Sequence, residues 1–180
     1  MTKVRRTTRE TQITLSLTRT SGPIEVTTGD TFLDHMLVTL ARYAGVGLTV
    51  DAVGDLRHHL IEDVAIVLGQ AFRKEIPDEA ERYGWAEVPM DEALVRAAID
   101  VGGRPFYGGE LPSPLYDHFL QSLAVNMGAT LHVVVTRGLD RHHVVEAGIK
   151  ATGLALRQAM REGDEVFSTK GAVALEFLEE

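Results

Sequence analysis

The chain has 180 residues, no cysteine and a formal net charge of −8 at pH 7, which is enough length for one domain or two small fused ones. The lack of cysteine excludes disulfides, thiolate metal sites and cysteine nucleophiles, and the acidic balance argues against a general nucleic-acid binder. No apolar run approaches the roughly 20 residues of a membrane span and the polar N-terminus resembles no signal peptide, so we expect a soluble cytoplasmic protein.

Hydrophobic periodicity predicts strands and helices in the first half of the chain. Ile13, Leu15 and Leu17 alternate with polar residues, which indicates a half-buried strand. Gly45 follows an apolar pattern at helical spacing and is expected to end that helix. The elements predicted in this way are a strand over 11–18, a short strand over 24–27, a helix over 32–43, a strand over 46–53 and a helix over 60–72. The polar stretch Lys74–Glu87 is the best candidate linker.

The second half of the chain repeats the first. The run DHMLVTLA at Asp34–Ala41 recurs 83 residues later as DHFLQSLA, and the motif RHHLIE that begins at Arg57 recurs 84 residues later as RHHVVE. Another alternating strand, predicted over 93–101, opens the second copy. We therefore expect two copies of one unit of about 85 residues, divided into 1–86 and 87–180 but forming one compact globular unit.

Each copy carries one HHxxE motif, which has the residue types of a metal site. On a helix, the first His and the Glu lie four residues apart and project from one face, whereas the middle His points about 100° away. Each motif is therefore suited to supply ligands to two ions. A repeat can be purely structural, with two halves that share one core, but six of the seven histidines fall at matched positions in the two copies.

Exchange of the two halves should also interchange the ligand sets. The symmetric solution places His35, His59, His142 and Glu146 on one ion, and His58, Glu62, His118 and His143 on the second. Other assignments fit the spacing, including His35 with the His58 set. Three imidazoles and one carboxylate leave open positions on an octahedral ion, as in a working site, although a closed structural core of two metals is an alternative. The seventh histidine, His132, falls in a run typical of a strand and is expected to be packed or hydrogen-bonded there.

Seven short motifs occur along the chain in an order that one known family shows. They are Arg6-x-Thr8-x-Glu10-Thr11, Phe32–Leu37, the first HHxxED, Pro89–Leu94, Gly103-Arg104-Pro105, the second HHxxEA with Lys150-Ala151, and Ser168–Gly171. In these motifs nearly the whole chain resembles imidazoleglycerol-phosphate dehydratase, of histidine biosynthesis. The resemblance implies an α/β fold, an α+β sandwich of the ribosomal protein S5 domain 2-like class, built from a duplicated unit with left-handed βαβ crossovers. It also implies a homo-oligomer, a 24-mer, with two Mn²⁺ ions per active site between neighbouring chains and no organic cofactor.

The family reaction removes water from imidazole glycerol phosphate and gives imidazole acetol phosphate. Its difficult step takes a weakly acidic proton from the carbon next to the imidazole ring, and two metal ions that grip the ring nitrogens would stabilise an imidazolate-like intermediate. The resemblance makes Glu10 the candidate for an acid or base, with Glu146 and His35 of the metal shell as further catalytic candidates. The residues that it assigns to the substrate phosphate are Arg82, Arg104, Lys150, Ser168 and Lys170.

The chain departs from the family pattern at several positions in or near these motifs. The departures are Thr39 for the usual Gln, Tyr43 for the usual His, Arg57 and Leu60 for the usual Asp and Thr, and Gly148-Ile149 before Lys150. None of these positions is a predicted metal ligand. Two other functions stay open. One is a dinuclear metallohydrolase, which would be expected to show an HxH pair or a bridging Asp, and the other is a catalytically impaired metal-binding assembly protein of the same fold.

Overall fold

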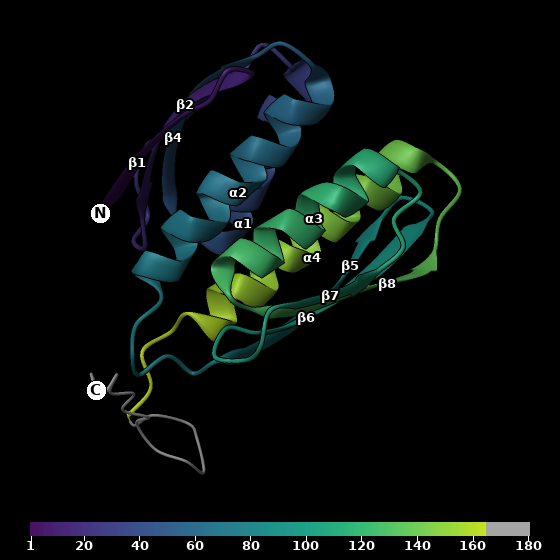
Figure 1. Cartoon of the computed structure of the whole chain (residues 1–180). Helices are drawn as coiled ribbons and strands as arrows, with labels where there is room; N and C mark the ends of the chain where they lie inside the picture. The colour runs from purple at the N-terminus through teal and green to yellow at the C-terminus, as the bar shows by residue number, and fades with distance from the viewer. Residues whose placement is uncertain (165–180) are drawn as a thin grey trace, which may run out of the picture.

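Two four-stranded sheets enclose four helices in the computed structural model, which describes residues 1–164 (Figure 1). The strand order is β1-β2-β4-β3 in the first sheet and β5-β6-β8-β7 in the second. The elements in chain order are β1 (Thr2–Thr7), β2 (Thr11–Thr18), β3 (Ile24–Thr27), α1 (Thr31–Ala44), β4 (Gly47–Gly54), α2 (Arg57–Glu75), β5 (Tyr83–Met90), β6 (Ala93–Asp100), β7 (Phe106–Gly109), α3 (Pro114–Met127), β8 (Thr130–Arg137) and α4 (Arg141–Ala159). The helices lie between the sheets, so the layers are those of an α+β sandwich.

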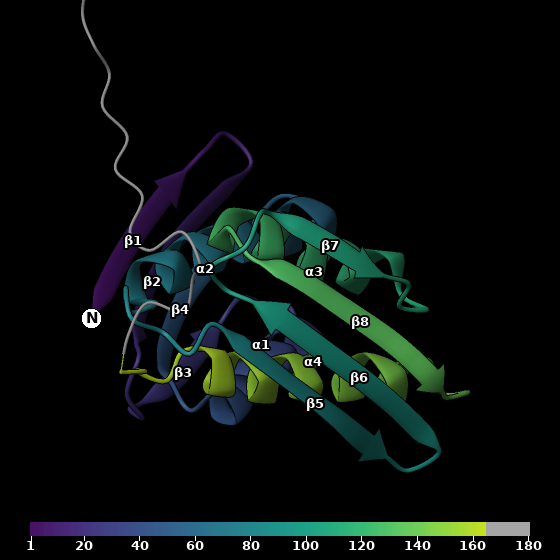
Figure 2. The ribbon, with the colours of Figure 1, turned by 90° about the horizontal axis from the view of Figure 1, so that it is seen from below.

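The duplication predicted from the sequence is present in the fold. Each half contains three strands, a helix, a fourth strand and a second helix, in that order. In the first half β4 pairs antiparallel with β2 and parallel with β3, and α1 is the crossover between the two parallel strands. In the second half β6, β7, α3 and β8 repeat this arrangement (Figure 2). The predicted fold class, a duplicated β-rich unit with two helices in each half, is therefore confirmed.

The largest differences from the predicted elements concern α2, β5 and β1, and the other bounds agree to within one residue. The helix α2 begins at Arg57, three residues before the prediction, and therefore carries both histidines of the first motif. The expected linker Lys74–Glu87 is shorter, because α2 continues to Glu75 and β5 begins at Tyr83. The inward residues of β5 include a glycine and an alanine, which are too small to give a clear alternating pattern. Likewise β1, which is not among the predicted elements, points the polar Arg6 inward.

The hydrophobic core joins the two halves. The helix α1 packs on α4 and α2 packs on α3, so each helix pair takes one member from each half of the chain. The apolar inward side chains of β2, which are Ile13, Leu15 and Leu17, are at most 1% exposed. One cluster of buried apolar residues runs through both halves and supplies the main stabilisation of the fold. None of the helices within residues 1–164 has the length and apolar character that crossing a membrane requires.

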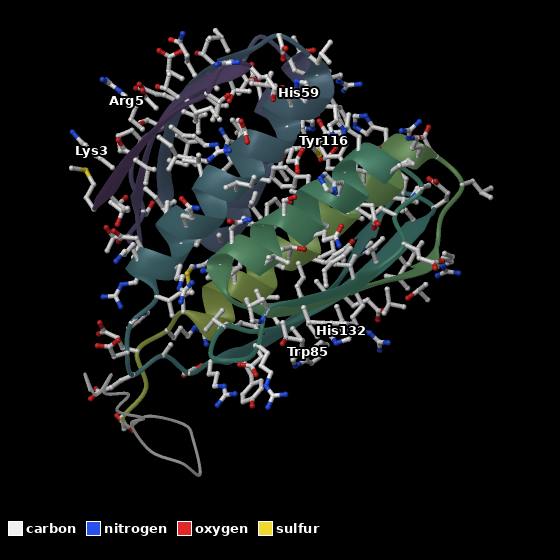
Figure 3. The ribbon with its side chains drawn as sticks, viewed as in Figure 1. Lys3, Arg5, His59, Trp85, Tyr116 and His132 are labelled. Atoms are coloured by element: carbon white, nitrogen blue, oxygen red, sulfur yellow. The ribbon has the colours of Figure 1, made fainter. Side chains whose placement is uncertain are left out.

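The outer faces of the two sheets differ in chemistry (Figure 3). The first sheet carries Lys3 and Arg5, whereas the second carries Trp85, which is 65% exposed, and His132. The His132 ring packs against the exposed Phe106, with 5.4 Å between the ring centroids. The seventh histidine therefore lies on the strand β8, as predicted, and outside the metal-ligand groups found within residues 1–164.

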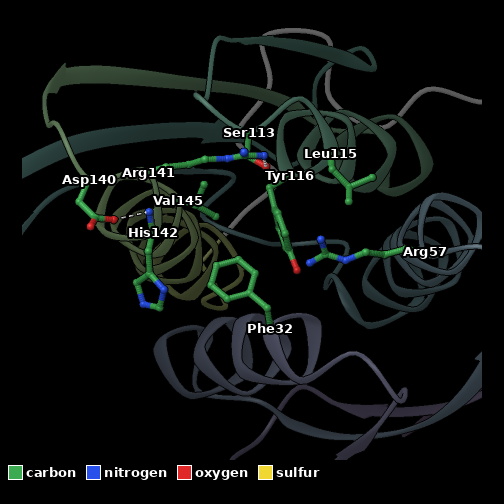
Figure 4. Close-up of a pocket in the computed structure, with 9 residues that line it drawn as sticks. All are labelled: Phe32, Arg57, Ser113, Leu115, Tyr116, Asp140, Arg141, His142 and Val145. Atoms are coloured by element: carbon green, nitrogen blue, oxygen red, sulfur yellow. Dashed lines mark hydrogen bonds between the residues drawn. The ribbon is translucent and has the colours of Figure 1, made fainter.

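The four helices begin at the same end of the sandwich, where their first turns line one cavity (Figure 4). The carboxylate of Asp30 accepts N–H bonds at the start of α1, and that of Asp140 accepts the N–H groups of His142 and His143 at the start of α4. Gly45, in the left-handed region with a φ of 72°, ends α1 as predicted. Because every predicted metal ligand lies in the first two turns of a helix, all of them gather at this end.

Candidate metal centres

Three predicted ligands meet between α1 and α4, and we call this group the first cluster: His35, His142 and Glu146. The Nε2 atoms of His35 and His142 lie 3.1 and 3.0 Å from the same Glu146 oxygen, Oε2. The two imidazole rings are stacked, with centroids 6.0 Å apart. One ligand atom from each side chain falls within 4.8 Å of the others, so one cation can contact all three.

The repeat builds a second cluster between α2 and α3, from His58, Glu62 and His118. Its Nε2 atoms lie 3.5 and 3.2 Å from the Glu62 carboxylate, and the rings stack with centroids 5.4 Å apart. The buried Nε2 of His118 faces the Glu62 carboxylate at 3.2 Å without the geometry of a hydrogen bond. A buried ring nitrogen beside a carboxylate that it does not hydrogen-bond fits a pair of ligands to one cation. The structure brings His35 to the first cluster and not to the His58 set.

Burial distinguishes the two carboxylates. Glu146 is only 6% exposed, whereas Glu62 is half-buried. Burial raises the pKa of the Glu146 carboxyl, but the hydrogen bonds from Lys150 and His35 outweigh this effect and leave the pKa below its usual value. Glu146 is therefore held as a carboxylate, the protonation state that a metal ligand requires.

The middle histidine of each motif points away from both clusters. His59 is turned 73° from the ring of His58, and His143 is turned 88° from that of His142. His59 donates from Nδ1 to Asp55 at 2.8 Å, and this hydrogen bond raises the pKa of the imidazole. Within one chain, neither His59 nor His143 joins the cluster to which the symmetric partition assigns it.

Glu92 holds the middle histidine of the second copy. Its carboxylate accepts the backbone N–H groups of Leu139 and Asp140, and it accepts the Nδ1–H of His143 at 2.7 Å. These bonds, with that from Asp140 as the largest contribution, lower the pKa of Glu92 to about 2. The bond to Glu92 raises the pKa of His143 in turn. A carboxylate on Nδ1 fixes the ring and leaves Nε2 for a metal, which is the common arrangement behind a histidine ligand.

Sequence reasoning missed Asp55 and Glu92. Asp55 stands four residues before His59, so helical spacing gives a signal that was available in the sequence. Glu92 lies 51 residues from His143 in the chain, and no local pattern connects the two.

Replacement of Glu92 by Gln is expected to return the pKa of His143 in the metal-free protein toward its ordinary value of 6.5, because the bond to the carboxylate is the largest cause of the rise. In the wild type, stability from a raised histidine pKa is present below pH 6.5 and is lost as the pH rises through the shifted value. The variant should lose this pH dependence. An NMR titration of the imidazole C–H signals measures the change. Asp55→Asn is the matched control, since it should shift His59 and leave His143 alone; an unshifted His143 in Glu92→Gln would contradict the assignment.

The N-terminal motif places Glu10 beside α2. Thr11 Oγ1 donates to the buried Asp63 carboxylate at 2.5 Å, and the Arg6 guanidinium pairs with the same carboxylate at 3.0 Å. Asp63 is the residue that follows Glu62 in the HHxxED motif, so these contacts tie the turn between β1 and β2 to the helix of the second cluster. The exposed Glu10 then lies with its Oε2 3.7 Å from Nδ1 of His59, outside the first cluster.

The residues expected to bind phosphate do not gather in one place within the chain. Lys150 lies at the first cluster, with Nζ 2.9 Å from Glu146 Oε1 and 5.8 Å from the ring centroid of Tyr43. Arg82 forms two hydrogen bonds, of 2.7 and 3.0 Å, to Asp100, which is the last residue of β6. Arg104 is exposed in the turn after β6. Ser168 and Lys170 lie outside the described residues.

Comparisons with known proteins agree with the motifs. A family model described as imidazoleglycerol-phosphate dehydratase matches residues 28–156. The imidazoleglycerol-phosphate dehydratase of Chlorobium chlorochromatii is 42% identical over 187 residues, which cover 94% of this chain and 95% of that protein. The imidazoleglycerol-phosphate dehydratase of Pyrobaculum arsenaticum is 44% identical over 185 residues, which cover 93% of this chain and 98% of that protein. A crystal structure of IGPD from Pyrococcus furiosus has a TM-score of 0.86 at 40% identity and covers 94% of this chain and 100% of that one. The chain therefore belongs to the imidazoleglycerol-phosphate dehydratase family.

Proposed function

We propose that this dehydratase depends on two divalent metal ions, bound at the two clusters, to remove water from imidazole glycerol phosphate and give imidazole acetol phosphate. The observation that carries the metal dependence is the pair of matched clusters, each with two imidazoles and one carboxylate. Such ligands suit Mn²⁺, Fe²⁺, Zn²⁺ or Ni²⁺ rather than Cu(I), and the resemblance to the family favours Mn²⁺. We also propose that the enzyme carries out this step of histidine biosynthesis in the cytoplasm.

When bound, the metal pair supplies Lewis-acid polarisation and a template for the imidazole ring of the substrate. The chain's own residues hold the substrate and move the proton. Glu10 is exposed beside His59, so its carboxylate is accessible to a substrate, and we assign it to the proton transfer. The product determines which bonds break: the hydroxyl leaves the carbon next to the ring and the proton leaves the following carbon, so that one water is lost. The enol that is formed becomes the ketone by a proton shift to the carbon next to the ring.

The distribution of the residues supports a site shared between copies of the chain. Glu92, bonded to His143, precedes the first residue of β6, whereas Asp100, bonded to Arg82, is its last residue. Seven residue steps along a strand separate these ends by roughly 23 Å, which is more than a small phosphate ester spans. We therefore propose that a homo-oligomer brings Arg82 and Arg104 of one subunit to the metal clusters of another. In such an oligomer, His59 and His143 of one subunit complete the ligand sets at the clusters of another. The resemblance to the family implies that the oligomer is a 24-mer.

Removal of the metal is expected to abolish turnover. After treatment with a chelator, production of imidazole acetol phosphate should fall to background, and added Mn²⁺ should restore it as about two ions bind per chain. The assay follows product formation and metal content in the same samples. Full turnover without metal would contradict the mechanism. Two bound ions with no turnover would favour the alternative of a metal-binding assembly protein that has lost catalysis.

A further inference from the structure

Three polar side chains, which we call the polar triad, meet where the turn between β1 and β2 lies against α2: Arg6, Thr11 and Asp63. The Thr11 hydroxyl and the Arg6 guanidinium both reach the Asp63 carboxylate, and Thr11 and Asp63 are buried. The buried Nε of Arg6 has no hydrogen-bond partner within residues 1–164. A buried ion pair with an unsatisfied donor is a weak source of stability, so the polar triad calls for another explanation.

The second half of the chain builds the same corner from apolar residues. The pairing of β5 with β6 matches that of β1 with β2, and the second motif reads HHxxEA where the first reads HHxxED. The counterparts of Arg6, Thr11 and Asp63 are Val88, Ala93 and Ala147, in that order, and all three are buried. The fold therefore forms this corner without a polar triad, and replacement of a buried ion pair by apolar residues is often neutral or stabilising.

The two corners also differ in the glutamate that each turn carries. Glu10 stands directly before the first residue of β2, as Glu92 stands directly before that of β6. The Glu92 carboxylate is held by His143 and by two backbone N–H groups. His59, the counterpart of His143, instead donates its Nδ1–H to Asp55. The Glu10 side chain is therefore exposed, and what fixes its place is the backbone of the turn.

A chain of hydrogen bonds connects that backbone to α2. The Thr8 hydroxyl accepts the backbone N–H groups of Glu10 and Thr11, at 3.1 and 2.9 Å. It lies 3.1 Å from the Thr11 hydroxyl, which in turn donates to Asp63. The backbone carbonyl of Glu10 accepts the N–H of Asp55 at 3.0 Å. Asp63 is thus the point at which the side chains of the turn are attached to the helix that carries the second cluster.

Given the proton-transfer role proposed for Glu10, on which this inference rests, we propose that Asp63 is a positioning residue for the dehydration. Through the Thr11 hydroxyl it holds Glu10 in place relative to the second cluster, and Arg6 keeps the Asp63 carboxylate in its orientation. An acid or base must lie within hydrogen-bond reach of the proton that it moves, and a displacement of about 1 Å can cost about 10²-fold in rate. This requirement exists in the half of the chain that carries Glu10 and explains why the polar triad is not duplicated.

The test is a double-mutant cycle on the full chain loaded with Mn²⁺. Glu10→Gln alone should lower kcat by about 10²–10⁴-fold. Asp63→Asn alone should lower kcat by about 10–100-fold and change KM by less than about threefold. Because residues that act as one unit are not additive, the variant with both substitutions should be no slower than Glu10→Gln. Metal content and Tm are measured in the same samples.

Thr11 provides a second pair of variants at nearly constant size. Thr11→Val removes the hydroxyl and should lower kcat as Asp63→Asn does, whereas Thr11→Ser keeps the hydroxyl and should stay within about threefold of the wild type. Thr14→Val is the matched control on the outer face of β2, where the hydroxyl accepts from Arg5 at 3.4 Å (Figure 3), and it should leave kcat unchanged.

The apolar corner of the second half suggests a variant that separates positioning from folding. A chain with Arg6→Val, Thr11→Ala and Asp63→Ala together should keep its two metal ions and a Tm within about 5 °C of the wild type. Its kcat should nevertheless fall by about 10–100-fold. A lower Tm with unchanged kcat would instead show that the polar triad serves the fold alone, and it would overturn the proposal.

The cycle also distinguishes failure of this inference from failure of the proposed function. If the losses in Glu10→Gln and Asp63→Asn multiply in the double variant, Asp63 does not act through Glu10, and the role of Glu10 in proton transfer still stands. Wild-type kcat in Glu10→Gln would overturn both the role of Glu10 and the positioning role of Asp63. The chelation experiment would then still decide the metal dependence.

Discussion

Replacement of Glu146 by Gln is expected to lower kcat/KM for imidazole glycerol phosphate by about 10²–10³-fold. The carboxylate contacts both histidines of the first cluster and Lys150, and it is buried. A neutral amide of the same shape keeps the packing but removes the negative charge that a divalent cation needs. Loss of a metal that stabilises developing charge removes several kcal/mol from transition-state binding, and each ~1.4 kcal/mol is a factor of ten in rate.

Metal content and kinetics measured together test this expectation. Glu146→Gln should bind about one ion per chain where the wild type binds about two. Glu62→Gln, the matched change in the second cluster, should also lose one ion but cost less stability, because Glu62 is half-buried and has no lysine partner among residues 1–164. Glu25→Gln, on an exposed strand position, is the control that should change neither quantity. Wild-type metal content together with wild-type kcat/KM in Glu146→Gln would contradict the assignment of this residue.

The parts of the site that the sequence predicted are those set by local geometry. His142 and Glu146 stand four residues apart, and the helical repeat alone places them on one face. His35 entered the same group through the duplication, since it has an equivalent in His118. These relations need no knowledge of how the layers pack.

The parts that the sequence did not predict depend on tertiary packing. Glu92 reaches His143 only because the turn after β5 lies against the start of α4, and no periodicity records that proximity. The separation of Arg82 from the clusters follows from the length of β6 and the pairing of the strands. The strand β5 was missed for a related reason, because its inward face uses small residues where the helix α4 comes very close.

That close approach makes Gly84→Ala the substitution with the largest expected effect on stability. A Cβ at this position of β5 would overlap the backbone carbonyl oxygen of Ala155 in α4 and would stand 3.0 Å from the backbone nitrogen of Ala159. Backbone atoms of a helix cannot move aside as a flexible side chain can. The sheet must therefore shift away from the helix, an overpacking cost of about 1–3 kcal/mol or more. For a chain of this size, we expect Tm to fall by about 3–10 °C.

Gly148→Ala is the matched control at the same interface, because α4 carries this glycine on the side that faces the second sheet. There the nearest atom to an added Cβ would be Leu111 Cδ2 at 3.4 Å, which is ordinary van der Waals contact. Alanine also has the higher helix propensity, by about 1 kcal/mol, so Tm should stay unchanged or rise by about 2–4 °C. Thermal unfolding followed by circular dichroism compares the two variants. If both glycines tolerate alanine equally, close contact between β5 and α4 is not what demands glycine at position 84.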